Sequence, residues 1–169
     1  MVPQVQSEWE KGRVTVNGQK MKKRFTHGLY NADLVLDCLA VGPGQTVIDA
    51  GCGSGYMSKK FSVKVGPSGT VYALDQDAGF IEELKTKINE SNIKALVTDI
   101  TDRVPIQASC IDLVYLSAVF HAFSRLQING FILEARRLLK PGGVLAIVEI
   151  EKRETPFGPP LESRYSPGE

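Results

Sequence analysis

The sequence predicts an α/β fold, a doubly wound sheet of five parallel strands with helices on both faces. Five short apolar runs recur along the chain, and stretches with the helical spacing of apolar residues separate them. Strands and helices that alternate in this way form right-handed crossovers, which produce a parallel sheet covered on both sides. The 169 residues, 43% of them hydrophobic, are enough to bury the core of one such domain.

The expected elements follow one another in a regular order. Residues 31–40 suit a helix, because their apolar side chains recur on one face and Asn31 can cap the first turn. The sequence Gly42-Pro43-Gly44 ends this helix. Later helices are expected at 56–65, 78–90 and 128–139, the last despite Gly130. The apolar runs expected to form buried strands are 46–50, 70–75, 93–97, 111–116 and 144–150.

Three parts of the chain differ in composition. Residues 1–27 form a polar, irregular extension, apart from a short strand at 13–16 that enters an Asn17-Gly18 turn. Residues 28–151 hold the alternating elements and form the main domain, and residues 152–169 form a tail rich in proline and glycine. The extension also carries a basic cluster, which we interpret as a solvated face rather than a site for RNA or an anionic substrate: Lys20, Lys22, Lys23 and Arg24.

Composition excludes several functions. The 20 Lys and Arg residues are balanced by 19 Asp and Glu, which argues against a broad basic face that binds nucleic acid. Cys38, Cys52 and Cys110 are too scattered for a disulfide framework or a metal-binding pair, and they indicate a reducing compartment. No apolar run approaches the ~20 residues that span a bilayer, and the polar start is not typical of a signal peptide. We therefore expect a cytoplasmic protein with no membrane span, no metal and no nucleic-acid partner.

A glycine-rich loop follows the first strand of the main domain. Its sequence is Asp49-Ala50-Gly51-Cys52-Gly53-Ser54-Gly55-Tyr56. Glycines at alternate positions let a ligand approach the backbone and permit positive φ angles, and the free N–H groups of the next helix face the same place. Ligands of an open parallel sheet bind beyond the carboxyl ends of its strands, so the residues that follow each strand are the candidates for a site.

The loop does not have the spacing of a dinucleotide-binding site. The G-x-G-x-x-G pattern that starts at Gly51 requires a third glycine at position 56, where this chain has Tyr56. Asp49, two residues before Gly51, would repel a pyrophosphate but would suit a cationic ligand. A nucleotide-dependent oxidoreductase is therefore the least favoured of the enzymes that use such a loop.

Five segments in order resemble the class I S-adenosylmethionine-dependent methyltransferases, whose fold is Rossmann-like. The sequence VIDAGCGSGY resembles their first motif, and VYALD, which ends at Asp75, resembles their second. Thr98-Asp99-Ile100 and the run 116–121 resemble the segments after the third and fourth strands. The run LLKPGGVLAIVEIE, residues 138–151, resembles the small-molecule group that includes the ubiquinone and menaquinone biosynthesis enzymes. Together these segments cover about residues 30–151.

The resemblance implies S-adenosylmethionine as cofactor and S-adenosylhomocysteine as product. It assigns Asp49 to the amino group of the methionyl part, Asp75 to the ribose hydroxyls and Asp99 to the adenine amino group, with Ile100 packed on the ring. Two residues in these segments also have a simpler interpretation. Asp99 can cap a turn, and Cys52 can be a small residue that fits the loop rather than a reactive thiol. The residues implied to bind the cofactor are Asp49, Ala50, Gly51, Cys52, Gly53, Gly55, Tyr56, Asp75, Gln76, Asp99, Ile100, Leu116 and Ser117.

The implied reaction is in-line transfer of a methyl group to an O, N or C nucleophile of a small molecule. The first helix forms part of a lid over the cofactor in the family, which makes His27 and Tyr30 substrate-side candidates together with Phe120 and His121. His121 is the candidate general base, although a histidine at this position in the family often only packs beside the cofactor. A base is needed only when the nucleophile keeps its proton. A cofactor-binding module or subunit without catalysis of its own is the alternative function.

The chain differs from the family after the fifth strand. Members normally continue with a helix and an antiparallel hairpin, but the Pro- and Gly-rich residues 152–169 cannot provide two central strands. We interpret this tail as the start of a substrate-side segment, and we expect a five-stranded sheet without the hairpin. Either the sequence is a shortened form of a longer chain, or the fifth strand is an edge that needs a cover. The tail, the N-terminal strand or a second copy in a homodimer are the candidates for that cover.

Overall fold

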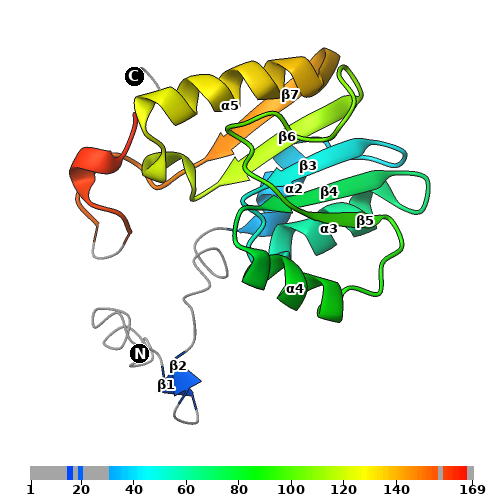
Figure 1. The fold of residues 1–169 in the computed structure, drawn as a ribbon, viewed down its shortest axis with the longest axis horizontal. Helices are drawn as coiled ribbons and strands as arrows, with labels where there is room; N and C mark the ends of the chain where they lie inside the picture. The colour runs from blue at the N-terminus through cyan, green and yellow to red at the C-terminus, as the bar shows by residue number, and fades with distance from the viewer. Residues whose placement is uncertain (1–14, 17–18, 21–30, 156–157, 167–169) are drawn as a thin grey trace.

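The computed structural model describes residues 15–16, 19–20, 31–155 and 158–166, and it contains the predicted parallel sheet (Figure 1). The order of its strands is β5-β4-β3-β6-β7, and every neighbouring pair is parallel. The chain therefore builds outward from β3 in one direction and then returns to the other side of β3. The strands are β3 (Thr46–Ala50), β4 (Thr70–Asp75), β5 (Ile93–Val97), β6 (Ile111–Ser117) and β7 (Leu139–Val148).

Two apolar cores, one on each face of the sheet, confirm that helices cover both sides. On one face α2 (Ala32–Cys38), α3 (Tyr56–Val65) and α4 (Ala78–Lys87) contribute Leu36, Phe61 and Leu84 to a buried cluster. On the other face α5 (Arg125–Leu138) contributes Phe131 and Leu138. In the described part of the chain, no helix has both the length and the apolar character needed to cross a membrane.

The helix starts follow the sequence signals. The side chain of Asn31 accepts the backbone N–H groups of Asp33 and Leu34 and so caps α2, as predicted. Ser124 and Gln127 form a reciprocal capping box at the start of α5. At its other end, α4 stops at Lys87, three residues before the predicted end at residue 90.

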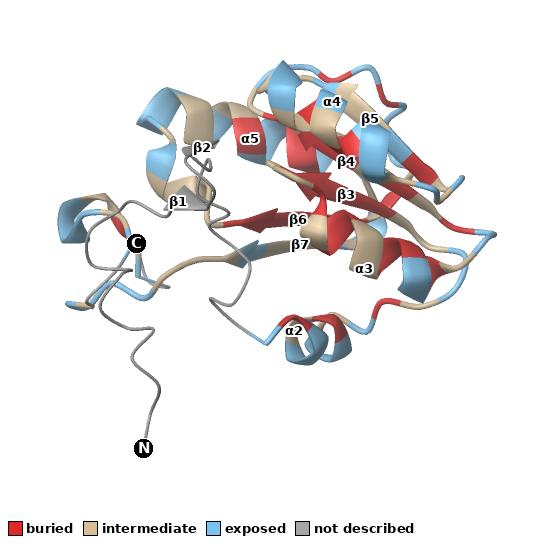
Figure 2. Ribbon diagram, turned by 90° about the horizontal axis from the view of Figure 1, so that it is seen from below, coloured by how far each residue is buried: buried red, intermediate tan, exposed pale blue. Residues whose placement is uncertain are grey.

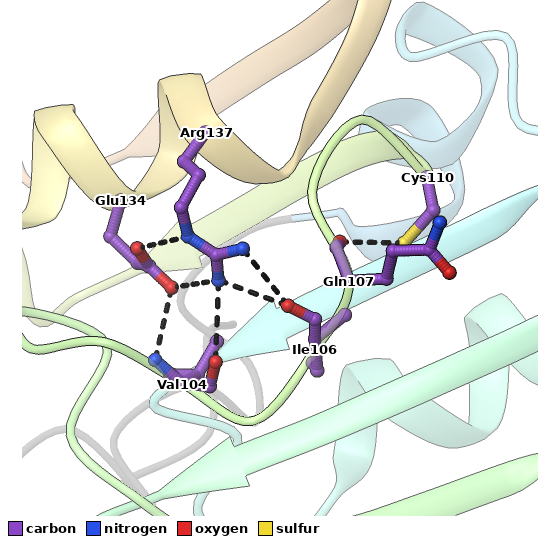
Figure 3. A network of polar contacts seen from close by, with 6 residues as sticks. All are labelled: Val104, Ile106, Gln107, Cys110, Glu134 and Arg137. Atoms are coloured by element: carbon purple, nitrogen blue, oxygen red, sulfur yellow. Dashed lines mark hydrogen bonds and ion pairs between the residues drawn. The ribbon is translucent and has the colours of Figure 1, made fainter.

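A loop, rather than a helix, connects β5 to β6. Side chains of α5 contact its backbone (Figure 3). The buried carboxylate of Glu134 accepts the N–H of Val104 at 2.9 Å, and the guanidinium of Arg137 donates to the carbonyls of Val104 and Ile106. Arg137 also pairs with Glu134, 2.7 Å from Nε to Oε2, so the buried charge is compensated. These contacts fix the loop, which ends at Cys110, against α5.

Close packing against this loop explains the glycine inside α5. A Cβ added to Gly130 would lie 2.2 Å from the carbonyl oxygen of Thr101, a backbone atom. Only a residue without a side chain allows the loop to approach the helix this closely. The predicted helix thus forms despite Gly130, and the loop contact is the reason for that glycine.

The prediction that the fifth strand is buried was wrong. Instead of 144–150, β7 covers Leu139–Val148, and it is drawn in the intermediate and exposed colours of Figure 2. Val144 and Ile147 are 48% and 39% exposed. The strand begins earlier because a register irregularity between the pairs Ile111–Leu139 and Leu113–Val144 accommodates the turn sequence. Among the described strands β6 is its only neighbour, so β7 is an edge strand, the position expected for it in a sheet without the hairpin.

The N-terminal strand does not cover this edge. The structure instead pairs β1 (Thr15–Val16) with β2 (Gln19–Lys20) in a separate antiparallel sheet, consistent with the predicted strand, while the predicted turn itself lies outside the described residues. Within the described ranges, no antiparallel strand joins the five-stranded sheet.

The described tail folds back around a buried arginine. The guanidinium of Arg164 donates to the carbonyls of Arg153 at 2.7 Å and Pro159 at 2.9 Å, and to the hydroxyl of Thr155 at 2.8 Å. The neighbouring ring of Tyr165 packs edge-on against Phe120, with 5.1 Å between the ring centroids. The tail therefore lies against the segment that follows β6.

Candidate functional site

A cavity of about 250 Å³ opens at the carboxyl ends of β3, β4 and β6. This is the point at which the strand order reverses, where an open parallel sheet binds its ligands. The described residues that line it are Asp49, Gly51, Cys52, Gly53, Ser54, Met57, Leu74, Asp75, Gln76, Phe80, Thr98, Asp99, Ile100, Tyr115, Ser117, Ala118, Val119 and Phe123.

Two glycines of the loop after β3 are required by their surroundings. Gly51 has φ +67°, and a Cβ added there would lie 2.6 Å from Cγ2 of Val119, in the segment after β6. Gly55 has φ +79°, and its Cβ would lie 2.3 Å from Cδ1 of Leu84 in α4. Gly51 therefore lets two strand ends meet at the cavity, while Gly55 lets α4 pack beneath the loop.

The carboxylate of Asp75 is held in place by two backbone groups. Its Oδ2 accepts the N–H of Gly53, and its Oδ1 accepts the N–H of Asp77, both at 2.9 Å. Each carboxylate oxygen can accept more than one hydrogen bond, so both remain able to bind ligand hydroxyl groups. Asp75 lines the cavity in this fixed orientation.

Asp49 is a buried acid in the same cavity, with 3% of its surface exposed. Its Oδ2 accepts a hydrogen bond of 2.5 Å from the hydroxyl of Ser58. Burial raises the pKa of this carboxyl to about 7, although the Ser58 hydrogen bond acts in the opposite direction, and the nearby charge of Asp75 raises it further. A cation bound beside Asp49 would favour its ionised form.

The lining carries negative charge without a compensating cation. Asp49, Asp75 and Asp99 all face the cavity, and the described lining contains no Lys, Arg or His. Such a site repels phosphate and attracts a cationic ligand. The charge pattern thus agrees with the argument from the sequence against a dinucleotide.

Asp99 has two roles at once. Its Oδ1 accepts the N–H of Thr101 at 2.8 Å, which is the turn-capping bond considered from the sequence. Asp99 also lines the cavity together with Ile100. The turn that it caps carries the loop toward its contact with Gly130.

Cys52 lines the cavity as a protonated thiol. Burial raises its pKa, and the charges of Asp49 and Asp75 act in the same direction. The thiolate required of a reactive cysteine is therefore disfavoured. This environment supports the interpretation of Cys52 as a small loop residue.

Four of the thirteen residues expected to bind the cofactor lie outside the cavity lining. Ala50 and Leu116 belong to the core under α5. Asp49 and Ser117, their neighbours on the same strands, face the cavity, and successive side chains of a strand point to opposite faces. Tyr56 packs against the other core, and Gly55 contacts α4. The remaining expected cofactor residues line the cavity: Asp49, Gly51, Cys52, Gly53, Asp75, Gln76, Asp99, Ile100 and Ser117.

Several lining residues were missed from the sequence. Met57 and Phe80 lie in the first turns of α3 and α4, and this position next to a strand end was the available signal. Ala118 has φ 54°, a left-handed conformation that is strained for a residue with a side chain and that reverses the backbone after β6. Ser54, Thr98 and Val119, like Ala118, lie in segments that the resemblance indicated but were not selected individually. The other missed lining residues are Leu74, Tyr115 and Phe123.

The substrate-side candidates are only partly described. Phe120 and His121 lie in the 3-10 turn η1 (Phe120–Ala122), beside the cavity but outside its lining. His121 is 3.0 Å from the carboxylate of Glu149, a residue that the sequence analysis did not select. His27 and Tyr30 lie outside the described residues.

Similarity to known proteins agrees with this geometry. A family model described as a methyltransferase domain matches residues 48–147. An uncharacterized methyltransferase of Synechocystis sp. is 32% identical over 130 residues, 76% of this chain and 58% of the relative. A ubiquinone/menaquinone biosynthesis C-methyltransferase of Bordetella parapertussis is 29% identical over 122 residues, 71% of this chain and 46% of the relative. The chain therefore spans about half the length of the curated relatives it matches.

A solved structure extends the similarity to three dimensions. The crystal structure of a SAM-dependent methyltransferase from Aquifex aeolicus superimposes with a TM-score of 0.76 at 29% sequence identity, over 85% of this chain and 77% of that one. The family match covers the sheet from β3 to β7 and with it the whole edge that carries the cavity. The chain belongs to the methyltransferase domain family.

Proposed function

We propose that this chain is an S-adenosylmethionine-dependent methyltransferase that transfers a methyl group to an O, N or C nucleophile of a small molecule. The observation that carries the proposal is the acidic cavity, in which Asp49, Asp75 and Asp99 face the ligand space and the described lining has no basic residue. S-adenosylmethionine carries a sulfonium and an ammonium group, so this charge pattern suits it.

The lining residues fit the separate parts of that cofactor. Asp75 offers two carboxylate oxygens for the ribose hydroxyls, already oriented by backbone N–H groups. Asp49 would face the methionyl ammonium group, beside the glycine loop. Phe80, Leu74 and Ile100 provide apolar surface for the adenine ring.

The chain's contribution to the reaction is binding and alignment. The cofactor, when bound, supplies an activated methyl group on a positively charged sulfur. The residues at the ends of β3, β4 and β6 hold the donor, and the acceptor approaches from the side of η1. Alignment of two reactants can supply about 7 kcal/mol or more of the barrier reduction.

Two measurements test the proposal. Calorimetry with S-adenosylmethionine and S-adenosylhomocysteine should show binding, and the absence of binding of either below millimolar concentration would contradict the cofactor assignment. Transfer of a labelled methyl group to a broad panel of small acceptors should follow. Tight binding with no transfer to any of them would favour the alternative, a cofactor-binding module without catalysis.

The proposal also includes the location of the protein and its partners. We place the protein in the cytoplasm with a small-molecule substrate and no nucleic-acid partner; free Cys38, Cys52 and Cys110 suit a reducing compartment. We also propose a homodimer that covers the edge of β7, where Val144 and Ile147 are exposed. Light scattering tests the dimer, and a monomer at micromolar concentration would rule it out.

A further inference from the structure

A histidine and a carboxylate face each other across the ends of β6 and β7. Nδ1 of His121 lies 3.0 Å from Oε2 of Glu149, and both side chains are largely buried. The other oxygen of the same carboxylate, Oε1, accepts the backbone N–H of Phe120 at 2.6 Å. Glu149 therefore holds both the ring of His121 and the main chain of the turn that carries it.

This arrangement defines which nitrogen of the ring carries the proton. An ionised carboxylate has acceptors only, so Nδ1 must donate its hydrogen to Oε2. In the neutral ring Nε2 is then the nitrogen with the free lone pair. The described residues offer no hydrogen-bond partner to Nε2, so it remains available to an incoming group.

The turn places His121 next to residues that line the cavity. His121 is the central residue of η1, and the residues just outside the turn, Val119 and Phe123, both line the cavity. Phe120 packs on Phe123 and on Tyr165 of the tail, so the turn is held from both sides.

We propose that His121 accepts the proton of the methyl acceptor and that Glu149 is the positioning residue that fixes its ring. This inference rests on the proposed methyltransferase function, and it narrows the acceptor to a nucleophile that still carries a proton, X–H. Nε2 takes that proton, and the bonding pair stays on X. X then bonds to the methyl carbon, the electron pair of the broken carbon–sulfur bond stays on sulfur, and the imidazolium returns its proton to water.

Replacement of Glu149 by glutamine gives a specific prediction. The carboxylate satisfies two donors, Nδ1–H and the N–H of Phe120, but an amide has only one acceptor oxygen. In Glu149→Gln the amide oxygen can keep the N–H of Phe120 only if the amide NH₂ faces Nδ1. Nδ1 must then become the acceptor, and the proton moves to Nε2, the nitrogen assigned to take the proton from the acceptor.

Nitrogen-15 NMR of the imidazole rings tests this directly, because a ring nitrogen that carries hydrogen and one with a lone pair give well-separated shifts. At a pH at which the rings are neutral, the ligand-free wild type should carry the proton on Nδ1 of His121, and Glu149→Gln should carry it on Nε2. His27, the other of the two histidines, is the internal reference and should not change.

Chemical reactivity gives a second readout. Diethylpyrocarbonate acylates an imidazole nitrogen with a free lone pair, so His121 should react at Nε2 in the wild type and several-fold more slowly in Glu149→Gln, relative to His27. A proton on Nε2 in the wild type would overturn the proposal even if the variant failed to fold. So would a proton that stays on Nδ1, or an unchanged acylation rate, in the folded variant. Calorimetry of the wild type with S-adenosylhomocysteine tests the proposed function separately.

Discussion

The N–H of Gly53 donates to Oδ2 of Asp75 at 2.9 Å and thereby joins the ends of two neighbouring strands. The glycine loop after β3 thus fixes the acid at the end of β4, so the two motifs work as one structure. Because the carboxylate of Asp75 is already oriented before a ligand binds, less side-chain conformational entropy is lost on binding.

Asp75→Ala should weaken binding of S-adenosylhomocysteine by about 10-fold or more, because hydrogen bonds to a charged group contribute roughly 1.5–3 kcal/mol. Calorimetry at constant pH and ionic strength measures the change. The exposed acid Asp102, outside the cavity lining, provides the matched control as Asp102→Asn and should leave the affinity unchanged. Equal affinities for wild type and Asp75→Ala would remove Asp75 from the proposed ribose site.

Asp49 should make the ligand-free protein less stable as the pH rises toward neutrality. Burial raises the pKa of Asp49 from 3.8 to about 7, so the folded chain binds its proton more tightly than the unfolded chain does. Between about pH 4 and pH 7 the folded state holds more protons, and the free energy of unfolding therefore falls as the pH rises. Urea unfolding at a series of pH values in this window measures the slope.

The isosteric variant Asp49→Asn is the control for this pH dependence. The amide cannot ionise but can still accept the hydroxyl of Ser58, so the decline in stability above about pH 4 should be smaller than in the wild type. A cationic ligand that favours the ionised acid should bind more tightly as the pH rises toward 7. An equal slope in wild type and Asp49→Asn would show that another group titrates in this window.

The sequence predicts most of the core elements because their signals are local. The bounds of β3, α3, β4 and β5 agree with the predicted ranges, since glycine, proline or polar residues limit each run. The apolar run at 144–150 by itself indicates a buried strand, and the edge position of β7 was expected only because the chain lacks the hairpin of the family it resembles. The early start of β7 depends on its irregular pairing with β6.

In the candidate site, too, some residues could be predicted from local sequence and others could not. Residues at or just beyond the carboxyl end of a strand, such as Asp75 and Asp99, were accessible from the sequence. Side chains alternate between the two faces along β6, and for this reason Leu116 faces the core while Ser117 faces the cavity. The pairing of His121 with Glu149 was not accessible, because it joins residues 28 positions apart through the packing of two strand ends.

Gly130→Ala should destabilise the protein even though alanine is the better helix former. The gain in helix propensity is about 1 kcal/mol, but the new Cβ would lie 2.2 Å from the carbonyl oxygen of Thr101. Backbone must move to remove this clash, and we expect a net loss of about 1–3 kcal/mol. Urea denaturation measures the free energy of unfolding.

The neighbouring exposed residue of α5 provides a matched control. Asn129→Ala makes a somewhat smaller gain in helix propensity, up to about 0.7 kcal/mol, at an exposed position, so it should be neutral or slightly stabilising. Displacement of the loop in Gly130→Ala should also disturb Asp99 and Ile100, which line the cavity. A Gly130→Ala variant as stable as Asn129→Ala would show that the loop does not press on the helix in solution.

Gly51 and Val119 should be energetically coupled, because a Cβ at position 51 would lie 2.6 Å from Cγ2 of Val119. Gly51→Ala should cost about 1–3 kcal/mol of stability through this clash and through the positive φ angle. Val119→Ala removes the methyl group in the way, so the double variant should recover on the order of 1 kcal/mol relative to additive losses. It should not recover fully, since the strain of the φ angle remains. Urea unfolding of the four proteins in this cycle measures the coupling, and strictly additive losses would contradict a direct contact between the ends of β3 and β6.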